Sequence, residues 1–168
     1  MKELVLVRHA KSSWKQDGLT DLARPLNKRG KADAPFMARC LASRGRRPDR
    51  IVSSPAARAR ATAIVFAQAH GYPEADIVPA PRIYEAAVSD LLEVLRNLTD
   101  ADDRVFLFGH NPSVTEFLVE VAGVNIDNVP TCGVAELRFQ TERWQDIEAT
   151  GAELVDFDYP KKHPERAG

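Results

Sequence analysis

The sequence has few cysteines and no long hydrophobic run. Its two cysteines, Cys40 and Cys132, stand apart, without the paired spacing of a metal site or the framework of a disulfide-rich domain. We therefore expect free thiols in a reducing compartment, and a cytoplasmic protein. No apolar stretch approaches the roughly 20 residues of a membrane span, and the N-terminal residues lack the layout of a signal peptide.

The sequence also lacks an excess of either charge. Its 168 residues include 23 Lys and Arg against 24 Asp and Glu, and the basic residues form no long run. The charge pattern therefore gives no reason to expect binding to nucleic acid or to an anionic membrane. With 44% hydrophobic residues, a chain of this length fits a single domain with one sizeable core.

What the sequence does contain is an alternation of short apolar runs and longer amphipathic segments. The short runs, rich in β-branched and large aliphatic residues, predict strands at 3–7, 50–52 and 104–108. The amphipathic segments predict helices at 32–44, 55–69, 88–98 and 112–122. This alternation predicts an α/β fold, a three-layer sandwich with a mainly parallel central sheet and helices on both faces.

The C-terminal part has a different character. Residues 133–139 and 152–159 have the composition of strands, with turn-rich sequence between them, and predict a hairpin at the edge of the sheet. After Tyr159 the chain has no apolar anchor. We therefore expect one domain over residues 1–160 and a flexible tail over residues 161–168.

Polar residues follow three of the predicted strands directly. The first strand runs into Arg8 and His9, the second into "SSPAARARATA" (53–63), and a later one into "GHNP" (109–112). In a parallel sheet of this kind, ligands bind outside the carboxyl ends of the strands. The three motifs are therefore expected to meet at one edge.

Two of these motifs share a design. Ser54-Pro55 and Asn111-Pro112 each place a good N-cap residue before a proline suited to the first helical position. Each pair predicts a helix whose N-terminus points back at the strand end. Free backbone N–H groups and the helix dipole favour anions there.

The predicted cluster consists of Arg8, His9, Arg58 and His110. A helix that opens at Pro55 directs Arg58 back toward the strand end, whereas Arg60 must point elsewhere. Arginine forks suit phosphate oxygens, and a histidine among cations should be neutral and nucleophilic. These features favour phosphoryl transfer to a histidine, and no metal site or cofactor is expected.

Each motif alone has an ordinary structural explanation. An Arg-His pair after a strand is often a surface feature, a histidine in a capped turn can be structural, and a helix arginine is commonly solvated. The convergence of all three motifs on one sheet edge favours the functional interpretation.

Together, "LVLVRHA", "SSPAARARATA" and "FGHNP" resemble the motif set of the histidine phosphatase superfamily, which has a phosphoglycerate mutase-like fold. The opening "RHAKSSW…ARPLNKRG" is most similar to its phosphohistidine phosphatase branch, the SixA-like proteins. This resemblance implies that His9 is the phosphorylated nucleophile and that Arg8, Arg58 and His110 form the phosphate pocket. In "RIYEA", Glu85 stands about where other branches carry the proton donor, although a solvated loop residue is equally compatible with the sequence.

Further residues are candidates for the rim of the pocket. Arg24, in "LARPLNKRG", resembles a motif of this branch and is expected to bind substrate, with a loop ion pair to Asp21 as the alternative. Asn111 is expected to contact the substrate beside His110. Lys11 and Ser12 follow the nucleophile, but the sequence does not fix their direction.

The resemblance implies a phosphatase that forms a phosphohistidine intermediate and acts on phosphohistidine in proteins. One alternative is a phosphatase or mutase acting on small phosphate esters. A mutase normally covers its site to keep water out, and the segment between Arg58 and His110 leaves little chain for a lid. The other alternative is a non-catalytic module that binds phosphorylated ligands, which would not need the nucleophile.

Overall fold

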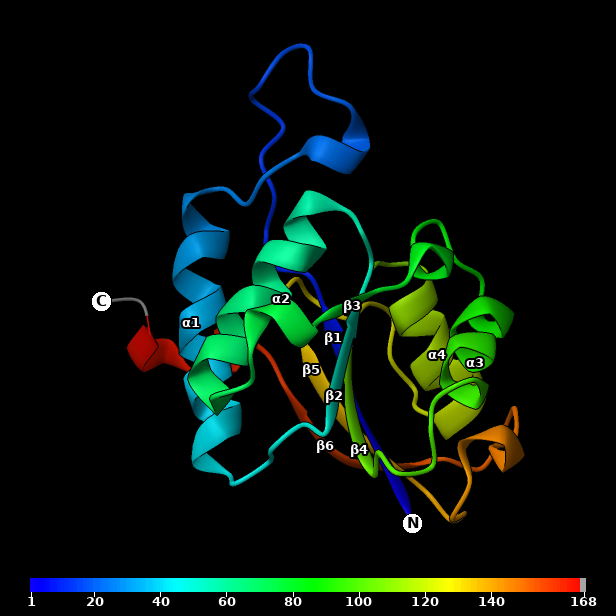
Figure 1. Ribbon diagram of the computed structural model, residues 1–168. Helices are drawn as coiled ribbons and strands as arrows, with labels where there is room; N and C mark the ends of the chain where they lie inside the picture. The colour runs from blue at the N-terminus through cyan, green and yellow to red at the C-terminus, as the bar shows by residue number, and fades with distance from the viewer. Residues whose placement is uncertain (167–168) are drawn as a thin grey trace.

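The computed structural model describes residues 1–166 and confirms the three-layer α/β fold (Figure 1). The strands are β1 (Lys2–Arg8), β2 (Arg50–Ser53), β3 (Val78–Pro79), β4 (Arg104–Gly109), β5 (Val134–Phe139) and β6 (Glu153–Asp158). They form one sheet in the order β3-β2-β4-β1-β5-β6. The first four strands are parallel, and β5 is antiparallel to both of its neighbours.

Four α-helices cover the sheet: α1 (Lys28–Ser43), α2 (Ala57–His70), α3 (Val88–Arg96) and α4 (Ser113–Ala122). α1 and α2 lie on one face and α3 and α4 on the other (Figure 1). β1 contributes to both cores, because Leu4 and Leu6 pack with α3 and α4 while Val5 and Val7 pack with α1 and α2. Burial on both faces explains why β1 is a continuous apolar run.

Short 3-10 helices occupy the connections: η1 (Asp21–Ala23), η2 (Glu74–Asp76), η3 (Pro81–Ile83), η4 (Trp144–Asp146), η5 (Pro160–Lys162) and η6 (Pro164–Arg166). None of the helices within residues 1–166 combines the length and apolar character that a membrane crossing requires.

All of the predicted strands and helices are present, with two differences. α1 begins at Lys28, earlier than the predicted residue 32, because Asn27 caps it by accepting a 2.9 Å hydrogen bond from Gly30 N. Its first turn is largely polar, so apolar periodicity did not reveal it. The sequence also did not predict β3, whose two residues are exposed and lie at the sheet edge.

The predicted start of the helix after β2 is wrong. α2 begins at Ala57, and Ser54 does not cap it. Ser54 Oγ instead accepts a hydrogen bond from Ala56 N at 3.2 Å and lies 2.7 Å from His110 Nε2. The serine therefore joins the ends of β2 and β4 across the sheet edge.

The C-terminal hairpin is confirmed, since β5 and β6 pair antiparallel at one edge of the sheet. The tail that we expected to be flexible forms η5 and η6 against the rest of the domain. His163 Nε2 lies 2.6 Å from Asp158 Oδ1, and Arg166 Nε donates to Asp33 Oδ1 at 3.2 Å. Residues 167–168 of that predicted tail lie outside the described residues.

The segment after β1 rises above the carboxyl ends of the strands and returns to α1 (Figure 1). It crosses the start of α1 in close contact. A Cβ atom on Gly30 would lie only 2.2 Å from the carbonyl oxygen of Lys11, which accepts a 2.9 Å hydrogen bond from Asn27 N. Only glycine allows this approach, which fixes the chain just beyond His9.

We predict that Gly30→Ala destabilises the protein even though alanine favours helices. The added methyl group must displace backbone, and overpacking of this kind costs about 1–3 kcal/mol. Urea denaturation would measure the loss. Lys31→Ala, at an exposed position on the same helix, is the control and should stay within about 0.5 kcal/mol of wild type. A Gly30→Ala protein as stable as wild type would contradict the close approach.

Candidate active site

A cavity of about 650 Å³ opens where β1, β2 and β4 end. Arg8 and His9 reach it from β1, His110 from the end of β4, and Arg58 from the first turn of α2. The structure thus brings together all four side chains of the cluster predicted from sequence. Arg60 does not line the cavity, although α2 begins later than predicted.

His9 is held as a neutral ring with a defined tautomer. Its side chain is buried, and Nδ1 lies 2.7 Å from the carbonyl oxygen of Ala10, an acceptor that requires a proton on Nδ1. The pKa of His9 is lowered to about 3, first by burial and then by His110, Arg58 and Arg8, against the opposing effect of the Ala10 hydrogen bond. Nε2 therefore carries a free lone pair at neutral pH.

His110 is a second neutral imidazole beside the first. The centroids of the His9 and His110 rings are 5.1 Å apart. The pKa of His110 is lowered to about 4, mainly by burial and then by Arg58. Its Nε2 contacts Ser54, whereas its buried Nδ1 has no hydrogen-bond partner among the described residues.

Arg8 and Arg58 are oriented by contacts at their outer nitrogens. Arg8 Nη1 donates to Val129 O at 2.8 Å, and Arg58 Nη1 donates to Asp21 O at 2.7 Å. The inner Nε of both arginines is buried and makes no hydrogen bond within residues 1–166. A buried N–H without a partner costs about 1–3 kcal/mol, so an anion in this cavity would gain stabilisation from both groups.

Asp21 organises the arginines, and the sequence motifs did not identify it as a pocket residue. Its carboxylate accepts hydrogen bonds from Arg58 Nη2 at 2.9 Å, Arg24 Nε at 3.0 Å and the Tyr84 hydroxyl. The Tyr84 hydrogen bond is the largest cause that holds the pKa of Asp21 far below its usual value, and both arginines add to it. The only sequence signal was the three-residue spacing from Arg24.

Arg24 forms the ion pair with Asp21 and also lines the cavity, whereas its predicted contact with substrate stays a prediction. Its Nη1 donates to Ser12 Oγ at 2.7 Å. Its guanidinium lies 3.4 Å from the ring centroid of Trp14, a tryptophan that is 78% exposed. Ser12 and Trp14 also line the cavity, so the segment after His9 forms one wall.

Glu85 lies at the cavity as an exposed carboxylate. It makes no hydrogen bond or ion pair to any described residue, unlike its neighbour Tyr84. The backbone of Glu85 has φ of 54°, in the left-handed region that a residue with a Cβ enters at a cost of about 1–2 kcal/mol. Glu85 therefore lies at the cavity, and its role as general acid stays a prediction.

Asn111 lines the cavity, and its side chain caps the first turn of α4, because Oδ1 accepts hydrogen bonds from Thr115 N at 3.2 Å and from Thr115 Oγ1 at 2.9 Å. α4 begins at Ser113 without a side-chain cap from Pro112. Both amide hydrogens of Asn111 are used, at 2.9 Å to Asn128 Oδ1 and 3.0 Å to Val129 O. Asn111 thereby positions the loop that orients Arg8, and its predicted contact with substrate stays a prediction.

The side chains around the cavity leave it positively charged. Arg8, Lys11, Arg24 and Arg58 line it together with the two carboxylates Asp21 and Glu85. The excess of cations and the neutral histidines favour a bound dianion such as a phosphoryl group. A neutral imidazole nitrogen beside such an anion can attack it.

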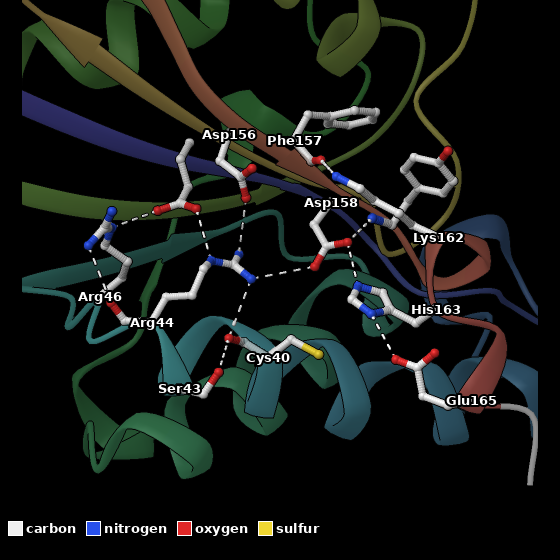
Figure 2. Close-up of polar contacts among 12 residues, drawn as sticks. Cys40, Ser43, Arg44, Arg46, Asp156, Phe157, Asp158, Lys162, His163 and Glu165 are labelled. Carbon is white, nitrogen blue, oxygen red and sulfur yellow. Dashed lines mark hydrogen bonds and ion pairs between the residues drawn. The ribbon is translucent and has the colours of Figure 1, made fainter.

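A possible metal cluster lies elsewhere. Within the described part of the chain, three potential ligands gather, Cys40, Asp158 and His163, with their ligand atoms inside 4.8 Å (Figure 2). None of them lines the catalytic cavity. The 2.6 Å between His163 Nε2 and Asp158 Oδ1 is a hydrogen-bond distance. Two ligands of a tetrahedral zinc ion would lie about 3.3 Å apart, so this arrangement does not fit zinc.

The sequence of this chain matches a protein family whose chemistry is consistent with this site. Residues 4–97 match the family model described as histidine phosphatase superfamily (branch 1). An uncharacterised chloroplastic protein of Arabidopsis thaliana is 35% identical over 156 residues, which cover 88% of this chain and 71% of the relative.

Solved structures show the same similarity. A structure from Agrobacterium tumefaciens that is named after the phosphohistidine phosphatase SixA is 33% identical, with a TM-score of 0.77 over 95% of this chain and 98% of that chain. The protein histidine phosphatase SixA in complex with tungstate has a TM-score of 0.80 over the same shares, and at 19% identity it supports the fold alone.

We predict that both cavity histidines stay neutral in mildly acidic solution. Their pKa values of about 3 and 4 lie below the ordinary value near 6.5, so protonation requires a lower pH. Nitrogen-15 NMR of labelled histidines should show His9 and His110 unprotonated at pH 5, with His9→Ala and His110→Ala variants assigning the signals. A midpoint above pH 6 for either ring would contradict the burial argument.

Arg58 and Arg60 provide a matched pair of variants. Removal of the charge-assisted contact from Arg58 to a bound phosphoryl group is expected to cost roughly 2–4 kcal/mol, or about thirtyfold to a thousandfold in rate. Arg60→Ala should hydrolyse an aryl phosphate at close to the wild-type rate. Steady-state assays of both variants test the geometry, and equal sensitivity of the two would mean that Arg58 does not act at the cavity.

Proposed function

This chain belongs to the histidine phosphatase superfamily and is a phosphatase, and from this premise we propose that its substrate is phosphohistidine in proteins. His9 is proposed as the nucleophile. The observation that carries the proposal is the neutral His9 ring, fixed by Ala10 with its Nε2 free, beside buried donors of Arg8 and Arg58. A non-catalytic binder would not need such a nucleophile.

In the first step, His9 Nε2 attacks phosphorus as the bond from phosphorus to the substrate nitrogen breaks. A substrate imidazole that carries a proton on its other nitrogen leaves as neutral imidazole, so this step needs no external acid. The phosphorylated His9 ring is cationic, and its Nδ1–H remains bonded to Ala10 O. Arg8, Arg58 and His110 face the phosphoryl oxygens as charge rearranges.

In the second step, water attacks the phosphorus of phosphorylated His9. The bond to Nε2 breaks, phosphate leaves with the water oxygen, and neutral His9 is restored. We assign the proton of the water to Glu85, because its exposed carboxylate lines the cavity. The cycle needs neither a metal nor a cofactor, because the arginines supply the positive charge.

The rim of the cavity supports a substrate attached to a protein. Trp14 is 78% exposed at this rim, and Glu85 is exposed as well. An exposed tryptophan stacked on Arg24 offers a flat aromatic surface to a bulky partner. We place the activity in the cytoplasm, where Cys40 and Cys132 would stay as the free thiols that they are here.

Small phosphate esters form the second candidate class, and Glu85 is the observation that favours it. An alkoxide leaves poorly unless an acid protonates it, and the carboxyl group of Glu85, which has no partner among the described residues, suits that task at the cavity. Substitution of Glu85 should therefore distinguish phosphohistidine substrates from phosphate esters.

The test compares kcat/KM on phosphohistidine peptide, phosphoserine peptide, aryl phosphate and sugar phosphate. We expect the phosphohistidine peptide to be hydrolysed much faster than the phosphoserine peptide or the sugar phosphate. Enzyme that is quenched with detergent at alkaline pH should carry an acid-labile, alkali-stable phosphoryl group that the His9→Ala variant lacks. A preference for the sugar phosphate would instead indicate a metabolic phosphatase.

Glu85→Gln should separate the two leaving groups. The substitution removes the ionisable group but keeps size and hydrogen bonding, so esters should lose about 10²–10⁴-fold, the usual contribution of general acid catalysis. In kcat/KM the phosphohistidine peptide should lose much less, because its leaving group departs neutral and kcat/KM does not include the later attack of water, in which Glu85 serves both substrates. Equal losses on both substrates would contradict the assigned role of Glu85.

A further inference from the structure

A second hollow lies directly beside the catalytic cavity. It has a volume of about 490 Å³, and Lys11 and Thr131 line both spaces. We call it the basic groove; Asn27, Arg29, Asp33, Pro130, Tyr159, Pro160, Lys161 and Arg166 complete its lining. A ligand with its phosphoryl group at His9 can therefore continue over this shared wall into the groove.

Three cations of the basic groove are unpaired. Asp33 and Arg166 form an ion pair with 3.2 Å between Nε and Oδ1 and satisfy each other. Lys11, Arg29 and Lys161 are exposed and make no ion pair or side-chain hydrogen bond to any of the described residues. Like charges gathered without counter-charges create a positive potential that attracts an anionic partner.

The start of α1 strengthens this potential. Its first turn carries Lys28, Arg29 and Lys31 and no acidic residue. The positive end of a helix dipole favours acidic residues there and disfavours cations. The stability of α1 therefore gives no reason for these charges, whereas binding of an anion at the groove does.

The C-terminal tail forms a fixed wall of the groove, and Figure 2 shows its attachment. His163 bonds Asp158 through Nε2 and Glu165 through Nδ1, and its ring packs edge-on against Phe36 of α1 at 5.3 Å. Asp158 is also paired with Arg44. These contacts hold Lys161 in place beside α1.

We propose that the basic groove binds an acidic segment of the protein substrate that flanks the phosphorylated residue, an inference that rests on the proposed function. The three cations come from separate elements: the segment after β1, α1 and the tail. Pro130, Tyr159 and Pro160 lie among them. Such a spread fits an extended chain with carboxylates along it better than one compact phosphate group.

The test measures binding separately from turnover. Two fluorescent peptides carry a non-hydrolysable triazole phosphonate in place of phosphohistidine, one with Asp and Glu around it and the other with Asn and Gln. Anisotropy titrations should show tighter binding of the acidic peptide. The Arg29→Glu/Lys161→Glu double variant should weaken that binding about fivefold to thirtyfold, and leave the neutral peptide and aryl phosphate turnover within about twofold.

Arg39→Glu is the matched control for the single Arg29→Glu variant, because it makes the same charge change on an exposed part of α1 outside the groove. The preference of wild type should shrink as ionic strength rises from 0.1 M to 1 M, where the screening length falls from about 10 Å to about 3 Å. Equal affinity for the two peptides, or an equal effect of Arg39→Glu, would overturn the inference. If phosphohistidine peptides bind with acidic preference but are not hydrolysed, the groove stands and the proposed substrate fails.

Discussion

The hydrogen bond between His9 Nδ1 and the carbonyl oxygen of Ala10 is the contact on which the site depends. A histidine can attack phosphorus only through a nitrogen that carries a lone pair, and a fixed proton on Nδ1 leaves that lone pair on Nε2. The backbone around this bond is itself fixed. Ala10 N donates to Thr62 Oγ1 of α2 at 3.0 Å, and Gly30 lets the next residue pass against α1.

Burial is the main cause that keeps the His9 ring neutral, and the cations beside it, which would otherwise repel one another, add to this effect. Arg58 and Arg24 both donate hydrogen bonds to the carboxylate of Asp21. The Tyr84 hydroxyl donates a third hydrogen bond to the same carboxylate. The aspartate therefore offsets part of the repulsion and leaves the inner Nε of Arg58 directed to no protein group. A site with fewer cations would bind phosphate weakly, and one without the acid would not hold its arginines in place.

Sequence patterns predicted the layers of the fold and the four central side chains, because both follow from short-range regularities. Apolar runs revealed the strands, and residues directly after strand ends must meet at one edge. The sequence could not reveal the contacts of Asp21 with the arginines or the contact of Ser54 with His110, since both depend on which loops fold over the sheet edge. A cap residue before a proline is a local signal, and at Ser54 the longer-range contact with His110 replaced it.

The contacts of Asn111 also could not be predicted from the local sequence. Its position beside His110 suggested a substrate contact, but its amide donates to Asn128 and Val129 of a segment distant in sequence. That segment leads into β5, which lies antiparallel beside β1.

β5, which runs antiparallel to β1, completes the side of the cavity next to Arg8. A further parallel strand would bring another carboxyl end to the edge. β5 brings the start of a strand instead, so the loop before it runs over the end of β1, where Cys132 N donates to Arg8 O at 3.0 Å. The same loop presents Val129 O to Arg8 Nη1. The change of strand direction next to β1 thus supplies the acceptor that orients Arg8 at the cavity.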